Sequence, residues 1–273
     1  MSPIQSLILG LIQGLTEFVP VSSSGHLVLV PWLLGWPQPD EAFVLAFDTV
    51  LHLGTLAAIL AFFWHDWIEL AAAWLQSVRQ RSLANPKSRL AWALVLGTIP
   101  AAVLGIAFED AFERLFATPV WAALFLLGTG VLLVAGERWG QSTQALAGIG
   151  ARHALLTGIA QGLAIAPGLS RSGATISAGR LLGLRREEAA RFSFLLATPA
   201  IAGAGAVQLV KLARADMLLP SAGILLIGFV TALVSGYLVI HWLLRYLQQH
   251  SLLPFAVYCW SLGSICLAVW LFR

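Results

Sequence analysis

The chain has 273 residues, of which 59% are hydrophobic and only 11% are charged, and its mean hydropathy is +0.84. Soluble domains carry roughly 25% charged residues, so this composition excludes a soluble protein and predicts a polytopic membrane protein. The formal net charge of +3 is too small to indicate nucleic-acid binding, and the basic residues are interpreted instead as signals of membrane topology.

An apolar run over 4–19 opens the chain, and at about 16 residues it is shorter than the ~20 residues that a membrane span requires. Pro20 and three serines interrupt this run, and the apolar sequence that follows ends near Leu34. Irregular backbone at membrane depth occurs only where it lines a cavity or is buried in protein. The pattern therefore predicts a re-entrant helical hairpin whose tip faces a site, with one kinked helix over 4–34 as the alternative.

Three longer apolar segments complete the first half, and each is long enough to span a membrane. They are predicted as transmembrane helices over 42–64, 90–108 and 119–136. A polar linker over 65–90 separates the first two, and an acidic turn at 109–113 separates the last two.

The second half repeats this plan. Residues 13–35 align without a gap with residues 161–183, at an offset of 148 positions. Three further spans are predicted over 189–210, 217–243 and 254–272.

Because each half holds an odd number of crossings, the second half should lie upside down relative to the first, as in many transporters. The expected fold is all-α, with six transmembrane helices and two re-entrant helical hairpins. It forms a single membrane domain of two inverted repeats, about 1–140 and 150–273.

The distribution of basic residues predicts the orientation. If the linker over 65–90 is cytoplasmic, so are 137–153, 184–191 and 244–252, and these segments with Arg180 hold eleven of the 16 Lys and Arg residues. Both termini should then be extracytoplasmic. Four basic residues fall on that opposite side, namely Arg114, Lys211, Arg214 and Arg273.

The two tips differ in their charged residues. The first carries Glu17 and His26, whereas the second carries Arg171. A charge inside an apolar segment costs several kcal/mol unless it is paired or functional, so we expect the tips to meet and form one site. A purely structural ion pair between Glu17 and Arg171 is the alternative.

The tips favour an anionic ligand. Each precedes a helix, whose N-terminal N–H groups and positive dipole end suit a phosphate, and Arg171 adds a bidentate fork for phosphate oxygens. Helix capping is the alternative role for serines at such positions. The predicted phosphate-binding residues are Ser22, Ser24, Gly25, Ser170, Ser172, Gly173 and Thr175.

Gln13 and Glu17 lie four residues apart and present two oxygens on one helical face. This arrangement suits a hard divalent cation, Mg²⁺ or Ca²⁺, when phosphate oxygens and water complete its shell. Ser23 is the candidate nucleophile, with His26 as general base and acid. Attack by water without a covalent intermediate is the open variant.

Two stretches carry a family resemblance over essentially the whole chain. QGLTEFVPVSSSGH (13–26) and PGLSRSGAT (167–175) resemble the two signature motifs of undecaprenyl-diphosphate phosphatases, the integral-membrane enzymes associated with bacitracin resistance. Gln13 is the less acidic of the two residue types that the first motif allows, and His52 stands where the family pattern has a Gln.

The resemblance implies removal of the terminal phosphate from a C55 polyprenyl diphosphate, which recycles the carrier lipid for peptidoglycan. It also implies dependence on a divalent metal, a location in the bacterial cytoplasmic membrane and an active site on its outer face. In this interpretation Glu17 with Gln13 binds the metal and Arg171 binds the phosphates. The partners are the lipid substrate and membrane lipids, and either a monomer or a homodimer fits. A transporter or flippase for an anionic lipid is the alternative function.

Overall fold

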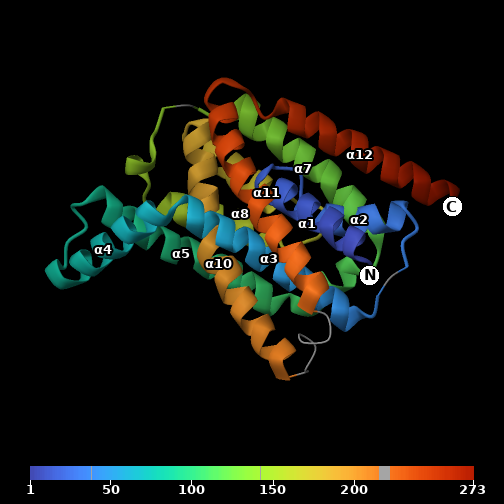
Figure 1. The fold of residues 1–273 in the computed structure, drawn as a ribbon. Helices are drawn as coiled ribbons and strands as arrows, with labels where there is room; N and C mark the ends of the chain where they lie inside the picture. Colours follow the sequence, from blue (N-terminus) through green and yellow to red (C-terminus); the bar gives the residue numbers. More distant parts are fainter. Residues whose placement is uncertain (38, 142, 215–221) are drawn as a thin grey trace.

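The structure is a computed structural model that describes residues 1–37, 39–141, 143–214 and 222–273. Within these ranges the chain forms twelve α-helices and one 3₁₀ turn, and no β-strand. Figure 1 shows the helices gathered into one body, with α4 projecting from its side. The helices are α1 (Pro3–Phe18), α2 (Ser23–Leu33), α3 (Glu41–Phe62), α4 (Trp64–Gln80), α5 (Pro86–Ala107), α6 (Glu109–Phe116), α7 (Pro119–Trp139), α8 (Ala151–Leu163), α9 (Arg171–Leu181), α10 (Arg186–Arg214), α11 (Ala222–Gln249) and α12 (Leu253–Phe272).

Six of the described helices, α3, α5, α7, α10, α11 and α12, are long and apolar enough to cross a membrane. They coincide with the six predicted spans, so the all-α class and the number of candidate spans are confirmed. The predicted start of the fifth span, 217–221, lies outside the described residues.

Two segments expected to be connections are helical. The polar linker predicted over 65–90 begins with α4, a helix of 17 residues, and the acidic turn after α5 lies within α6. The buried residues of α4, Leu70, Ala73 and Ser77, lie three and four positions apart, so one face of this helix packs against the rest of the protein. The linker prediction followed the basic residues Arg79, Arg81, Lys87 and Arg89 and overlooked this spacing.

The first predicted tip is a break between two separate helices. Four residues, Val19–Ser22, lie between α1 and α2. Pro20 has no N–H to continue the helical ladder, and Ser22 adopts a left-handed backbone with φ of 70°. The Ser22 side chain then caps α2 by accepting a hydrogen bond from the N–H of Gly25 at 3.2 Å.

The second tip has the same design. The segment Ala164–Ser170 separates α8 from α9. The Ser170 side chain accepts a hydrogen bond from the N–H of Gly173 at 3.0 Å and so caps α9. Re-entry of both hairpins from opposite membrane faces stays a prediction.

The first arm of each repeat packs against a long helix from the other repeat. Helix α1 lies along α11, and α8 lies along α5 (Figure 1). Glycines permit both crossings: a Cβ on Gly10 would lie 2.7 Å from the Gly228 carbonyl oxygen, and one on Gly97 would lie 2.9 Å from the Ala154 carbonyl oxygen. Each hairpin is therefore held by the opposite half of the chain. The two matched crossings fit the predicted inverted repeat, which stays a prediction.

The basic segments meet at one end of the helices. Arg186 pairs with Glu137 and Arg191 pairs with Asp66. Arg180 donates to the carbonyl oxygen of Gly140 at 3.2 Å. The first two contacts join the start of α10 to the end of α7 and to α4, and the third joins α9 to the end of α7. At the far end of α10, Lys211 lies 3.7 Å from Glu109. The side chain of Arg214 lies outside the described residues.

The orientation can be tested with single cysteines in a variant whose two buried native cysteines, Cys259 and Cys266, are replaced by Ala. Exposed Gln80 and Glu113 mark the two ends of the fold. We expect Glu113→Cys in intact cells to react with a membrane-impermeant maleimide, and Gln80→Cys to react only after the cells are opened. Labelling of Gln80→Cys from outside would reverse the orientation.

Candidate active site

Glu17 lies in the last turn of α1 and joins the two hairpins. Its carboxylate is buried, with 5% of the side chain exposed. Oε1 accepts a hydrogen bond from Arg171 Nη2 at 2.5 Å, and Oε2 accepts one from Ser23 Oγ at 2.5 Å. Gln13 Nε2 adds a third bond to Oε2 at 3.1 Å. The predicted convergence of the two tips is therefore confirmed for Glu17, Ser23 and Arg171.

The two donors from the tips occupy matching positions. Ser23 is the first residue of α2 and Arg171 is the first residue of α9, and the offset of 148 residues aligns them. Because side chains at a helix start lie near its free N–H groups, Glu17 meets both helix N-termini at once. A duplicated position has thus become a hydroxyl in one copy and a guanidinium in the other.

One guanidinium nitrogen of Arg171 has no hydrogen-bond acceptor among the described residues. Its Nη2 binds Glu17, but its Nη1 is buried and has no hydrogen-bond partner among the described residues. A buried N–H without an acceptor costs about 1–3 kcal/mol. An anion at the junction of the two tips would remove that cost and would meet two helix N-termini.

The hydroxyl groups of the tips divide into two kinds. Ser22 and Ser170 cap their own helices, and their Oγ atoms lie 3.3 and 3.2 Å from those of Ser24 and Ser172. Thr175 is fully buried, and its hydroxyl contacts Ser193 Oγ at 2.6 Å. Capping therefore accounts for Ser22 and Ser170, and Thr175 contacts α10. Phosphate binding by any of these residues stays a prediction.

Glycines let the two tips touch. A Cβ on Gly25 would lie 3.0 Å from the Cα of Gly168, across the junction. Gly168 itself has φ of 87°, which disfavours other residues. Gly173 packs in the same way against its own cap, with a Cβ position 3.0 Å from Ser170 Cβ.

No hydrogen bond joins His26 to the candidate nucleophile Ser23 among the described residues. The Nδ1 of His26 lies 2.7 Å from the Ser22 carbonyl oxygen, and its Nε2 lies 2.7 Å from the hydroxyl of Tyr258 on α12. Ser23 instead gives its hydrogen bond to Glu17. The expected Ser23–His26 contact is therefore absent from the described hydrogen bonds, because other partners hold both ring nitrogens.

Three residues at the site, His52, Thr129 and Tyr258, were not predicted as site residues from the sequence. His52 Nε2 lies 3.8 Å from Glu17 Oε2, so the position that departs from the family pattern does face the site. Thr129 on α7 accepts from the Ser170 N–H and donates to the Gly168 carbonyl oxygen, both at 2.9 Å. Neither Thr129 nor Tyr258 lies in a motif or in the repeated stretches, so no signal in the sequence pointed to them.

One buried oxygen beside Glu17 has no hydrogen-bond partner among the described residues and bears on the predicted metal site. Gln13 is fully buried, and its Oε1 has no hydrogen-bond partner among the described residues. No group of three His, Cys, Asp or Glu side chains suited to a metal occurs in the described parts of the chain. The protein alone thus offers an incomplete oxygen set, which suits a hard cation that also binds substrate oxygens and water.

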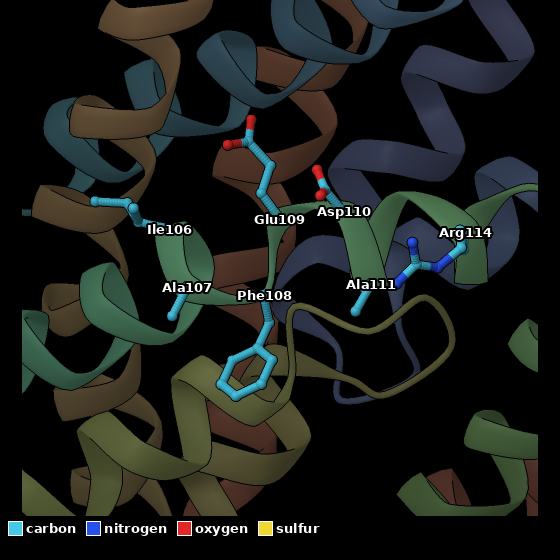
Figure 2. Close-up of a pocket in the computed structure, with 7 residues that line it drawn as sticks. All are labelled: Ile106, Ala107, Phe108, Glu109, Asp110, Ala111 and Arg114. Carbon is cyan, nitrogen blue, oxygen red and sulfur yellow. The ribbon is translucent and has the colours of Figure 1, made fainter.

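A surface hollow lies elsewhere. Figure 2 shows it at the junction of α5 and α6, where Glu109, Asp110 and Arg114 are among its lining residues. It shares no residue with the Glu17 site, and its polar groups include no member of either motif. We therefore place the candidate active site at the junction of the tips.

Comparisons with known proteins identify the family of the chain. The profile of the family described as "Bacitracin resistance protein BacA" matches residues 6–265. The chain belongs to this family. A protein of Thermomicrobium roseum named undecaprenyl-diphosphatase is 42% identical over 273 residues, covering 97% of both chains.

Two further relatives carry the same name. That of Methanosphaera stadtmanae is 45% identical and covers 96% of both chains, and that of Desulforudis audaxviator is 41% identical and covers 100% of both. The match thus extends over both repeats and includes both tips.

Replacing Thr129 with Val tests how the second tip is held. The substitution keeps the shape but removes the acceptor for the buried Ser170 N–H, which should cost about 1–3 kcal/mol. We expect a lower unfolding temperature in detergent. The control is Thr98→Val, because Thr98 bonds only to the Leu94 carbonyl of its own helix, at 2.7 Å. Equal stability of the two variants would contradict the assigned role of Thr129.

Proposed function

We propose that the chain hydrolyses undecaprenyl diphosphate to undecaprenyl phosphate and inorganic phosphate, and so recycles the carrier lipid of cell-wall synthesis and confers bacitracin resistance. Membership of the family and the names of the relatives support this activity. The observation that carries it is the buried Glu17–Arg171 pair, whose free Arg171 donor lies where two helix N-termini meet. That arrangement suits the terminal phosphate of a diphosphate.

The geometry favours Glu17 as the group that takes a proton from Ser23. Ser23 Oγ lies 2.5 Å from Glu17 Oε2, whereas His26 binds elsewhere. We propose that Ser23 Oγ bonds to the terminal phosphorus while the bond from phosphorus to the bridging oxygen breaks, and undecaprenyl phosphate leaves. A water oxygen then bonds to phosphorus while the bond from phosphorus to Ser23 Oγ breaks; Glu17 returns its proton to Ser23 Oγ, and the phosphate leaves with the protons of the water. Arg171 neutralises the charge that develops on the phosphoryl oxygens.

Gln13 Oε1 and Glu17 would hold a divalent cation, Mg²⁺ or Ca²⁺. When bound, the cation would neutralise charge on the diphosphate. Gln13 also keeps the Glu17 carboxylate in place through its amide, since Nε2 donates to Oε2.

We also propose that the protein lies in the bacterial cytoplasmic membrane with its active site toward the outer face. The end rich in basic residues would then be cytoplasmic.

Light scattering in detergent would distinguish a monomer from a homodimer. Phosphate release by purified protein in detergent tests the activity itself, because transport or lipid flipping needs a sealed membrane and release of phosphate does not.

Arg171 provides the first mutational test. Arg171→Lys keeps the charge but loses the planar fork, and Arg171→Ala removes both. Loss of an oriented donor at a site of developing charge typically costs ~10² to 10³ in rate, so we expect kcat to fall by at least that factor in Arg171→Ala. Phosphate release per folded molecule and the unfolding temperature should be measured together. Near-normal turnover from folded Arg171→Ala would leave this residue a purely structural role.

Glu17→Gln provides the second test. The neutral amide has nearly the same shape but cannot take a proton from Ser23 or pair with Arg171, so we expect a loss of about 10²-fold or more in kcat. Direct Mn²⁺ binding, measured by electron paramagnetic resonance with Mn²⁺ as the probe, should weaken as well.

The matched control for Glu17→Gln is Glu69→Gln. Glu69 is 55% exposed and pairs with Lys87 on the surface, where ion pairs contribute little. We expect this variant to keep full turnover and full Mn²⁺ binding. Unchanged metal binding in Glu17→Gln would remove Glu17 from the proposed metal site.

A further inference from the structure

The ring of His26 is fixed at both nitrogens. The side chain is buried, with 4% exposed. Its Nδ1 lies 2.7 Å from the Ser22 carbonyl oxygen, which can only accept a hydrogen bond. Nδ1 therefore carries a hydrogen in every protonation state. In the neutral ring, Nε2 is left as the acceptor.

The partner of Nε2 is a group that can either donate or accept. The Tyr258 hydroxyl lies 2.7 Å from Nε2, and the two ring planes differ by 4°. When His26 is neutral, the hydroxyl donates to Nε2. When His26 is protonated, Nε2 donates and the same oxygen accepts, after rotation of one O–H bond. Phenylalanine could do neither.

Helix α12 is fixed in register against the first tip. Cys259 Sγ lies 3.8 Å from the Pro20 carbonyl oxygen, and Trp260 Nε1 donates to the Leu127 carbonyl oxygen at 3.1 Å. One turn further on, a Cβ on Gly263 would lie 2.9 Å from the Ala123 carbonyl oxygen. These neighbours hold Tyr258 beside His26 through contacts with the first tip and with α7.

Glu17 contacts Ser23, so His26 is not the direct partner of the nucleophile. The hydrogen-bond system of His26 and Tyr258 is separate from that of Glu17, Ser23 and Arg171 in the described contacts. Because Nδ1 keeps its hydrogen and Nε2 faces the Tyr258 hydroxyl, a proton enters or leaves the His26 ring through that hydroxyl, and the ring must keep one orientation for this transfer.

We propose that Tyr258 is a positioning residue of the active site, whose hydroxyl holds the His26 ring in one orientation and satisfies Nε2 in both protonation states. This inference rests on the proposed phosphatase function for its effect on rate. Its structural part, the bond between the two side chains, is independent of the substrate.

Tyr258→Phe isolates the hydroxyl, because the ring and its packing remain. We expect kcat for phosphate release from undecaprenyl diphosphate to fall about 10-fold to 100-fold, less than the ~10²–10⁴-fold that loss of the acid–base group itself would cost, while KM changes little. The matched control is Tyr237→Phe on α11, where the ring packs edge-on against Phe62 at 5.6 Å between centroids. This control should keep full turnover.

A double-variant cycle tests whether Tyr258 acts through His26. In a His26→Ala background, Tyr258→Phe should cause no further loss of kcat, because the group that it positions is gone. An additional loss of the same size as in the parent protein would show that Tyr258 acts independently of His26, and would overturn the proposal.

Nitrogen-15 NMR of histidine-labelled protein gives a readout that does not depend on turnover. The chain has 6 histidines, so the His26 signal is identified by its disappearance in His26→Ala. We expect one tautomer in the parent protein, with hydrogen on Nδ1, and a shifted Nε2 signal in Tyr258→Phe. An unchanged Nε2 signal together with full kcat would overturn the proposal. Failure of the parent protein to release phosphate would instead overturn the proposed function, while the NMR comparison would still test the bond.

Discussion

The site depends on one buried carboxylate. Glu17 accepts hydrogen bonds from Gln13 in its own helix, from Ser23 in the first tip and from Arg171 in the second. A buried charge is costly when it is unpaired, so these donors are a condition for burying a carboxylate at this position. Because they come from both halves of the chain, the same interaction closes the site and joins the repeats.

Close packing around the tips brings the two hairpins near enough for this interaction to form. Gly25 and Gly168 allow the backbones to touch, since a Cβ on Gly25 would lie 3.0 Å from the Gly168 Cα. Thr129 then ties the second tip to α7 through two hydrogen bonds. The close glycine contacts of α1 on α11 and of α8 on α5 bring each hairpin to the opposite repeat. Small residues therefore determine where the charged ones can meet.

Two hydrogen-bond systems with different chemistry lie at the first tip. Glu17, Ser23 and Arg171 combine a proton acceptor, a hydroxyl and a cation with a free donor. His26 and Tyr258 form a second pair, in which the tautomer is fixed by the Ser22 carbonyl oxygen. The Ser22 side chain caps α2, and the Ser22 carbonyl oxygen binds His26 Nδ1. The irregular turn that breaks the helix therefore also orients the histidine.

The sequence by itself determined the class of fold, the six candidate spans and the two breaks, because apolar length and the positions of Pro20 and the serines are local properties. It also determined that Glu17 and Arg171 belong together, since each repeat lacked the charge that the other carried. It did not predict that α4 is a helix, because the basic residues around 79–89 led to the whole segment over 65–90 being interpreted as a linker. Only the tertiary structure decided which partner each side chain takes. Ser23 binds Glu17, and His26 binds Tyr258, which lies 232 residues away in sequence. The reason is physical: a spacing of three residues on one helix permits a Ser23–His26 contact, but the packing of α12 against the tip places the Tyr258 hydroxyl 2.7 Å from His26 Nε2.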